Sequence, residues 1–299
     1  MPPSPTGVPF HASLLDACTV SSNKSLKPLT QIHARTIVHG ISRRNFIHWK
    51  LVSAYASRGR IPQATLLFSS ARRRPTFLFN SLIRAYASLD LFSDSLAFFR
   101  RMLVARKPVD RHTFPSVLKS CGGLLNPRLG RQVHGMVLAN GFGLDLANAN
   151  AVIGMYAKCL ELEGARKMFD GMPVRNEVSW AALMSGYGML GNFGEVLVLF
   201  DRMVEEGVRV DSVCFTAVLS ACKRGGMVDK GMEYFRMMEG RFGVKPGLEH
   251  YTCVVDMLGK AGRVEEVEEL VKRMDMELDE TFLETLSGVL RIRGHRIMN

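Results

Sequence analysis

The sequence contains no apolar run long enough to span a bilayer, which takes about 20 mainly apolar residues, so we expect no membrane-embedded segment. Its six cysteines include no C-x-x-C pair, which argues against a zinc site or a redox dithiol. No H-x-E motif followed by C-x-x-C occurs, so the zinc ligands and the general acid/base glutamate of a nucleobase deaminase are missing. We therefore expect no catalytic residue, no metal and no cofactor.

Acidic residues are scarce in the first half of the chain. Residues 1–145 hold 20 Lys/Arg and five Asp/Glu, whereas residues 146–299 hold 19 and 23. The net charge of +11 therefore lies in the N-terminal half, which we expect to attract a polyanion such as nucleic acid. A charged surface kept for solubility is the alternative. The first 44 residues have one acid, as organelle targeting segments do, but repeat-like sequence begins by about Val8 and leaves little room for one.

The stretch 177–211 has the pattern of two short helices joined by a turn. We number its residues from 1 to 35 and use these numbers as repeat positions. Two sets of apolar residues have the spacing of one helix face, at positions 4, 7, 8 and 11 and at 20, 23, 24 and 27: Trp180, Leu183, Met184 and Tyr187, then Val196, Leu199, Phe200 and Met203. Gly191 interrupts the first helix, and Gly207 stands where a C-terminal cap is expected. One hairpin cannot bury both faces, so the pattern predicts stacked neighbours.

Copies of this hairpin recur along nearly the whole chain. Position 11 is a tyrosine or a cysteine in seven copies, and the spacing shows a larger period of 101 residues that spans three copies: Cys18, Tyr55, Tyr86, Cys121, Tyr156, Tyr187 and Cys222. The phasing predicts a tail at 1–7 and then eight repeats, at 8–44, 45–75, 76–110, 111–145, 146–176, 177–211, 212–247 and 248–279. The first repeat requires an insertion around 21–25.

Position 24 is aromatic in five repeats, and position 27 is often methionine. We expect these side chains to form the core between helices, with no cofactor implied: Phe68, Phe99, Phe169, Phe200 and Phe235. The cysteines at position 11 are expected to be small core residues in a reducing compartment. His33 and His134 occur in matching Gln-x-His contexts and are predicted to be packing or helix-surface residues.

The repeats resemble the pentatricopeptide repeat family, and specifically its plant P-L-S subclass, through these motifs: Val178-Ser179-Trp180, Ile153-Gly154-Met155-Tyr156-Ala157-Lys158-Cys159, Ala165-Arg166-Lys167-Met168-Phe169-Asp170, Phe114-Pro115-Ser116-Val117-Leu118-Lys119-Ser120-Cys121 and Glu249-His250-Tyr251. The resemblance implies an all-α, right-handed superhelical solenoid of antiparallel helix hairpins over 8–279. Residues 280–299 resemble the start of the subclass's E motif, with Leu283 in place of the usual Trp and Arg293 in place of the usual His. We expect no DYW-type deaminase within these 299 residues.

Position 5 lies about 100° around the helix from the core-facing position 4, and the last residue of a repeat leads into the next helix. An asparagine at such a position can both donate and accept, so it can distinguish base edges. By resemblance, these two positions carry the family's base code, and the expected RNA-binding residues are Asn80, Asp110, Asn150, Asn176, Ala181, Asp211, Thr216, Thr252 and Asp279.

Three of the pairs match the code: Asn80 with Asp110 implies U, Asn150 with Asn176 implies a pyrimidine, and Thr252 with Asp279 implies G. The others depart from it: Ala181 with Asp211, Thr216 with Gly247, Pro115 with Asp145, and Trp49 with Pro75. For each asparagine or aspartate, a role as a helix cap is the alternative.

The resemblance implies a sequence-specific, single-stranded RNA-binding protein of a plant mitochondrion or chloroplast, with the mitochondrion slightly preferred. It further implies site recognition for C-to-U RNA editing, with a DYW-type deaminase or another editing factor in trans. Two alternatives stay open: an α-solenoid scaffold for protein–protein contacts, and a truncated copy without function. The two functions differ in where the Lys/Arg of 1–145 should lie. RNA binding predicts that they line the inner groove of the solenoid, and the scaffold predicts that they cover its convex side.

Overall fold

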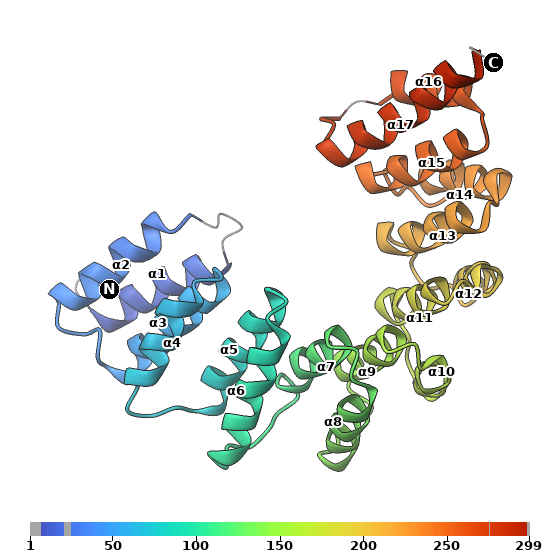
Figure 1. The fold of residues 1–299 in the computed structure, drawn as a ribbon. Helices are drawn as coiled ribbons and strands as arrows, with labels where there is room; N and C mark the ends of the chain where they lie inside the picture. Colours follow the sequence, from blue (N-terminus) through green and yellow to red (C-terminus); the bar gives the residue numbers. More distant parts are fainter. Residues whose placement is uncertain (1–6, 21–24, 275, 298–299) are drawn as a thin grey trace. The chain divides into compact units, whose positions relative to one another are not determined.

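The computed structural model describes residues 7–20, 25–274 and 276–297, and these form 17 helices and no strand (Figure 1). The structure confirms an all-α solenoid of helix hairpins. Most of the expected N-terminal tail, most of the insertion near 21–25 and the last two residues lie outside the described part. Within the described part, no helix combines the length and the apolar character that crossing a membrane requires.

The chain falls into two compact units, Met1–Met155 and Tyr156–Asn299. The N-terminal unit holds α1 (Val8–Val20), α2 (Lys27–Val38), α3 (Asn45–Ser57), α4 (Ile61–Ser70), α5 (Thr76–Ser88), α6 (Phe92–Val104), α7 (Phe114–Gly123) and α8 (Pro127–Ala139). The boundary falls within α9 (Leu146–Lys158). The C-terminal unit holds α10 (Leu162–Asp170), α11 (Glu177–Met189), α12 (Phe193–Glu205), α13 (Ser212–Gly225), α14 (Val228–Gly240), α15 (Leu248–Lys260), α16 (Val264–Lys272) and α17 (Glu280–Ile297).

In each compact unit, the first helix of a hairpin packs against the first helix of the next. In the N-terminal unit α3 contacts α1 and α5, and α5 also contacts α7. In the C-terminal unit the same pattern joins α11 to α13, α13 to α15 and α15 to α17. The second helix packs on the first within a hairpin, as α6 does on α5 and α12 on α11. Helices α5 and α11 start at Thr76 and Glu177, the first residues of two predicted repeats, whereas α7 starts at Phe114, three residues after the predicted start at 111.

The core follows the apolar stripes. Four of the five position-24 aromatics are buried as predicted, and Phe235 is half-buried: Phe68, Phe99, Phe169 and Phe200. Trp180 at position 4 is fully buried and packs edge-on against Phe169, with ring centroids 4.7 Å apart. Burying an aromatic or aliphatic side chain of this size contributes about 1.5–3 kcal/mol. The position-11 cysteines are also buried, as predicted.

Position 15 of the repeat, which ends the first helix, has a left-handed backbone in seven consecutive repeats. Three of these residues are not glycine and have φ between 50° and 59°, and four are glycines: Asp90, Leu125 and Leu160, and Gly59, Gly191, Gly226 and Gly262. Gly207, predicted as a C-terminal cap, follows α12 with φ of 69°. The tight turn therefore imposes one backbone conformation at this position whatever residue occupies it.

Candidate nucleic-acid interface

Asn80 on α5 and Asp110, the last residue of the same repeat, are in direct contact. Asn80 Nδ2 donates to Asp110 Oδ1 at 2.9 Å and to Oδ2 at 3.1 Å. Asn80 Oδ1 accepts from Thr113 Oγ1 at 2.9 Å. Because an amide has two N–H donors and an oxygen with two lone pairs, one donor and one acceptor of the half-exposed Asn80 remain for a ligand. The two positions that the family's code pairs thus act here as one polar group.

The other last-position residues cap the next helix. Asp211 accepts from Cys214 N at 2.9 Å, and Asp279 accepts from Phe282 N at 2.8 Å. Asn176 Oδ1 accepts from the amide of Ser179 at 3.2 Å and forms a capping box with it. The capping role that the sequence left open therefore exists, and in each case it engages one side-chain oxygen.

The remaining position-5 residues differ in what they offer. Thr216 and Thr252 donate their hydroxyl protons to the carbonyl oxygens four residues earlier, at 3.0 and 2.8 Å. The Thr216 oxygen also lies 3.0 Å from His250 Nε2 and is therefore partly engaged, whereas the Thr252 oxygen stays available as an acceptor. Asn150 is half-buried on α9. Ala181 is 9 % exposed and presents only a methyl group. Among the described residues no hydrogen bond joins Thr252 to Asp279, so this pair is not assembled in the way that Asn80 and Asp110 are.

Position 3 carries buried polar side chains that the sequence analysis did not single out: Thr113, Asn148, Ser179, Cys214 and His250. Asn148 Nδ2 donates to Arg111 O at 3.2 Å, and His250 Nε2 donates to Ser212 O at 2.9 Å, each reaching the first residue of the preceding repeat. His250 Nδ1 accepts from Gly247 N at 2.9 Å, so the ring proton lies on Nε2. These bonds fix where each first helix begins, and a polar residue recurring two places before position 5 is the signal that could have revealed them.

Two cavities lie over the first helices. In the N-terminal unit, a cavity of about 690 Å³ is lined from α1, α3 and α5 and includes Phe46, Trp49, Phe77 and Arg84. Trp49 Nε1 donates to Arg73 O at 2.9 Å, and the ring meets Phe77 edge-on at 5.5 Å. In the C-terminal unit, a cavity of about 430 Å³ over α11, α13 and α15 includes Thr216. Position 5 contributes Trp49 to the first cavity and Thr216 to the second, whereas Asn80 lines neither.

Position 2 supplies exposed apolar side chains one helical turn before position 5: Phe46, Phe77, Val178 and Val213. Nucleic-acid bases stack on such side chains when they leave a single strand. Lys50 Nζ lies 5.0 Å from the centroid of the Phe46 ring and is also paired with Asp16, which lines the same cavity. This combination of apolar faces and cations is typical of single-strand binding surfaces.

The cysteines and the polar clusters offer no sign of other chemistry. Burial raises the pKa of the Cys214 thiol to about 12 and that of Cys222 to about 11, so both stay protonated near neutral pH. In the part of the chain that the structure describes, no group of three His, Cys, Asp or Glu side chains is placed to hold a metal ion.

Family models and curated relatives match the repeats. The PPR repeat model matches residues 77–106, 149–176, 213–241 and 249–277, and a PPR repeat family model matches residues 175–224. A putative pentatricopeptide repeat-containing protein of Arabidopsis thaliana is 38 % identical over 247 residues, which is 83 % of this chain and 34 % of the relative. Two more from Arabidopsis thaliana, one named mitochondrial and one chloroplastic, are 36 % identical over 280 residues and 31 % over 296. They are covered for 44 % and 33 % of their length, and this chain for 93 % and 95 %.

The fold has a solved counterpart in the pentatricopeptide repeat protein PPR10 from maize, with a TM-score of 0.75 at 15 % identity over 98 % of this chain and 44 % of PPR10. A structure of PPR10 with an 18-nucleotide psaJ RNA element gives a TM-score of 0.74, again at 15 % identity, over 95 % of this chain and 42 % of that chain. This chain thus spans less than half the length of these relatives. The repeat models together match about half of the chain, and with these relatives they show that it belongs to the pentatricopeptide repeat family.

Proposed function

We propose that this chain binds single-stranded RNA in a sequence-specific way, with one base facing each decoding repeat. The observation that carries the proposal is the contact between Asn80 and Asp110, which leaves one amide donor and one amide acceptor on the first-helix side. Uracil offers an N–H donor beside a carbonyl acceptor, so a single amide can satisfy both. A good base-edge contact discriminates by about 1–3 kcal/mol. The RNA-bound PPR10 structure, with the same fold, supports the proposal.

Stacking and charge would supply the affinity that does not depend on base identity. The cavity over α3 and α5 offers the faces of Phe46 and Phe77 beside Lys50 and Arg84. Base stacking on an aromatic side chain contributes about 1–3 kcal/mol for each base. Contacts between cations and phosphates release counterions, so the affinity for RNA should fall as the salt concentration rises.

Within this function we propose a role in organellar RNA processing, namely site recognition for C-to-U editing with the deaminase supplied in trans. The resemblance to the P-L-S subclass and to the start of its E motif over 280–299 supports editing. The relatives named mitochondrial and chloroplastic support an organellar location. Comparing organellar transcripts from plants with and without the protein tests this part: one or more lost C-to-U changes is the expected result, and an unchanged set would refute it.

The RNA-binding proposal is tested by selecting ligands from a randomised single-stranded RNA pool with the full 299-residue chain. We expect one enriched sequence that binds at least tenfold more tightly than its own shuffled version at 0.1 M salt. Equal binding of the enriched and the shuffled strand would refute sequence recognition. Binding to neither strand would favour the protein–protein scaffold instead.

A further inference from the structure

The period of 101 residues places two matching helix pairs in the chain, one in each compact unit. Helices α4 and α6 correspond to α10 and α12, so each residue of the first copy matches the residue 101 places later. Two arginines keep their places: Arg74 matches Arg175, and Arg101 matches Arg202. The two matching helix pairs can therefore be compared directly, because they share the arginines and differ in the charged residues around them.

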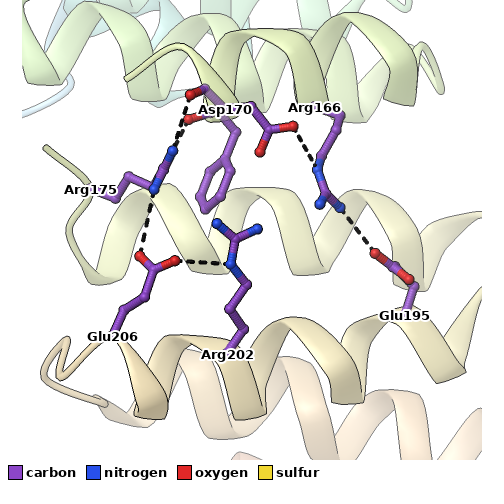
Figure 2. A network of polar contacts seen from close by, with 7 residues as sticks. Arg166, Asp170, Arg175, Glu195, Arg202 and Glu206 are labelled. Carbon is purple, nitrogen blue, oxygen red and sulfur yellow. Dashed lines mark hydrogen bonds and ion pairs between the residues drawn. The ribbon is translucent and has the colours of Figure 1, made fainter. Parts of the chain in front are cut away.

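In the second copy, a carboxylate lies between the two arginines (Figure 2). Glu206 accepts from Arg202 Nε at 2.9 Å and lies 3.5 Å from Arg175 Nη1. The other two donor nitrogens of Arg175, Nε and Nη2, donate to the carbonyl oxygens of Phe169 and Asp170 at 3.0 and 3.1 Å. Arg175 is thus held by the end of α10 with only Nη1 directed to the carboxylate.

In the first copy, the same frame lacks the carboxylate. Arg74 Nε donates to Phe68 O at 3.0 Å and Nη2 donates to Ser69 O, as in the second copy. The guanidinium groups of Arg74 and Arg101 lie 5.3 and 5.8 Å from the centroid of the Phe68 ring, so both flank one side chain. The residue that matches Glu206 is Ala105. Among the described residues, neither Arg74 nor Arg101 forms an ion pair.

The residues around the two arginines also carry more positive charge in the first copy than in the second. Segments 61–76 and 92–107 hold seven Lys/Arg and one Asp, whereas the matching segments 162–177 and 193–208 hold four Lys/Arg and seven Asp/Glu. Exposed Arg100 stands where the second copy has Asp201, and exposed Arg72 and Arg73 precede Arg74. The first copy is therefore much richer in basic than in acidic residues, which suits a polyanion better than an isolated carboxylate.

We propose that Arg74, which follows α4, and Arg101 on α6 form a phosphate-binding site in the N-terminal unit. A phosphodiester of bound RNA takes the position that the Glu206 carboxylate takes in the second copy. Guanidinium groups suit this task because they are always charged, and Arg74 keeps Nη1 for the phosphate while Nε and Nη2 are bound to carbonyl oxygens. The site reads no base, and it lies just after the end of α4 and on α6, whereas the cavity of the N-terminal unit is lined from the first helices. It rests on the RNA binding proposed above but uses a different surface.

The test places a carboxylate between the two arginines of the first copy by the substitution Ala105→Glu in the full chain. Ala105 is exposed and ends a helix, as Glu206 does, so the variant should fold as the wild type does. With a shuffled 20-nucleotide single-stranded RNA, we expect about fivefold weaker binding at 0.1 M salt and a slope of log K against log[salt] reduced by about 0.7. Val104→Glu is the control, since it adds the same charge at the neighbouring exposed residue; its effect should be at most half as large.

Two results would overturn the site. In the first, Ala105→Glu leaves the RNA affinity and the salt slope unchanged, or changes them no more than Val104→Glu does. The other is a polyglutamate peptide that binds the wild type and not Ala105→Glu while RNA binding is the same for both, which would assign the surface to an acidic protein. The variant Asn80→Ala distinguishes this site from base reading. If it loses base selection and keeps the wild-type salt slope, the loss is due to base reading and not to the phosphate site. A wild type that binds no RNA would overturn both.

Discussion

Thr113 Oγ1, immediately before α7, donates a 2.9 Å hydrogen bond to Oδ1 of Asn80 on α5. The same hydroxyl lies 3.1 Å from Asp110 Oδ1, and its own backbone N–H donates to that oxygen at 3.0 Å. A fully buried residue of the next repeat therefore sets the orientation of the amide that we propose reads a base. The base-reading group extends over two repeats.

Replacing Thr113 with valine keeps the shape of the side chain and removes the hydroxyl. We expect the preference for U at the base facing Asn80 to fall about tenfold, because the amide loses its fixed orientation, and stability to fall by about 1 kcal/mol. Competition between RNAs that differ at this base measures the effect. Thr113→Ser keeps the hydroxyl and should retain most of the preference. A Thr113→Val protein with unchanged preference would show that Asn80 is positioned by other contacts.

Leu160 and Gly191 occupy position 15 with φ of 59° and 77°. A left-handed backbone costs a non-glycine residue about 1–2 kcal/mol, and Leu160 is half exposed, so Leu160→Gly should stabilise the chain by up to about 1 kcal/mol. The matched change Gly191→Ala should destabilise it by about 1 kcal/mol. Urea unfolding midpoints measure both. Shifts in the opposite directions would contradict the conformation assigned to this turn.

Stability should fall in alkaline solution. The pKa of Cys222 is raised by burial to about 11, above its unfolded value of about 8.5, so the folded state keeps a proton that the unfolded chain loses. Stability is therefore complete below about pH 8.5 and decreases as the pH rises toward 11. Cys222→Ala should flatten the pH dependence of the thermal midpoint between pH 9 and 11. Burial also raises the pKa of Tyr234, so part of the slope should persist. Identical slopes in both proteins would contradict the role of Cys222.

Trp49 lines the cavity of the N-terminal unit and occupies position 5 of a repeat whose code pair does not decode. Because an aromatic ring stacks on any base, we expect Trp49→Ala to weaken matched and shuffled RNA alike, by roughly 1–3 kcal/mol. Trp49→Phe keeps a ring, loses the bond to Arg73 O, and should weaken binding less. Fluorescence anisotropy with both RNAs measures this. A loss confined to the matched strand would mean that Trp49 selects a base.

The repeat phasing predicted where hairpins begin because apolar side chains at fixed spacing must face a common core. Residues at positions 4, 11 and 24 were expected in the core, and Trp180, Cys222 and Phe200 are buried there. The left-handed turn at Leu160 could not be predicted from its residue type, since only the geometry of the hairpin imposes it. The polar residues at position 3 recur at a fixed spacing, but their contacts could not be predicted from it, because the partners of Asn148 and Cys214 lie 37 residues away on another repeat.

The sequence predicted some residues of the candidate site correctly and missed or misassigned others. Asn80 and Asp110 were paired by the code and do touch, although Thr113, which completes the group, was missed. Ala181 was expected to bind RNA because of its repeat position alone, but it has no polar group and is only 9 % exposed. A repeat position states where a side chain starts, whereas its hydrogen-bonding capacity depends on neighbours from the next repeat.

The most direct test of base reading by Asn80 compares the wild type with Asn80→Ala on the RNA selected by the wild type, with each base replaced in turn by the other three. We predict that the variant loses selection at one base, by about 1–3 kcal/mol, and keeps wild-type selection at all the others. Unchanged selection at every base, or an equal loss at all of them, would contradict the account.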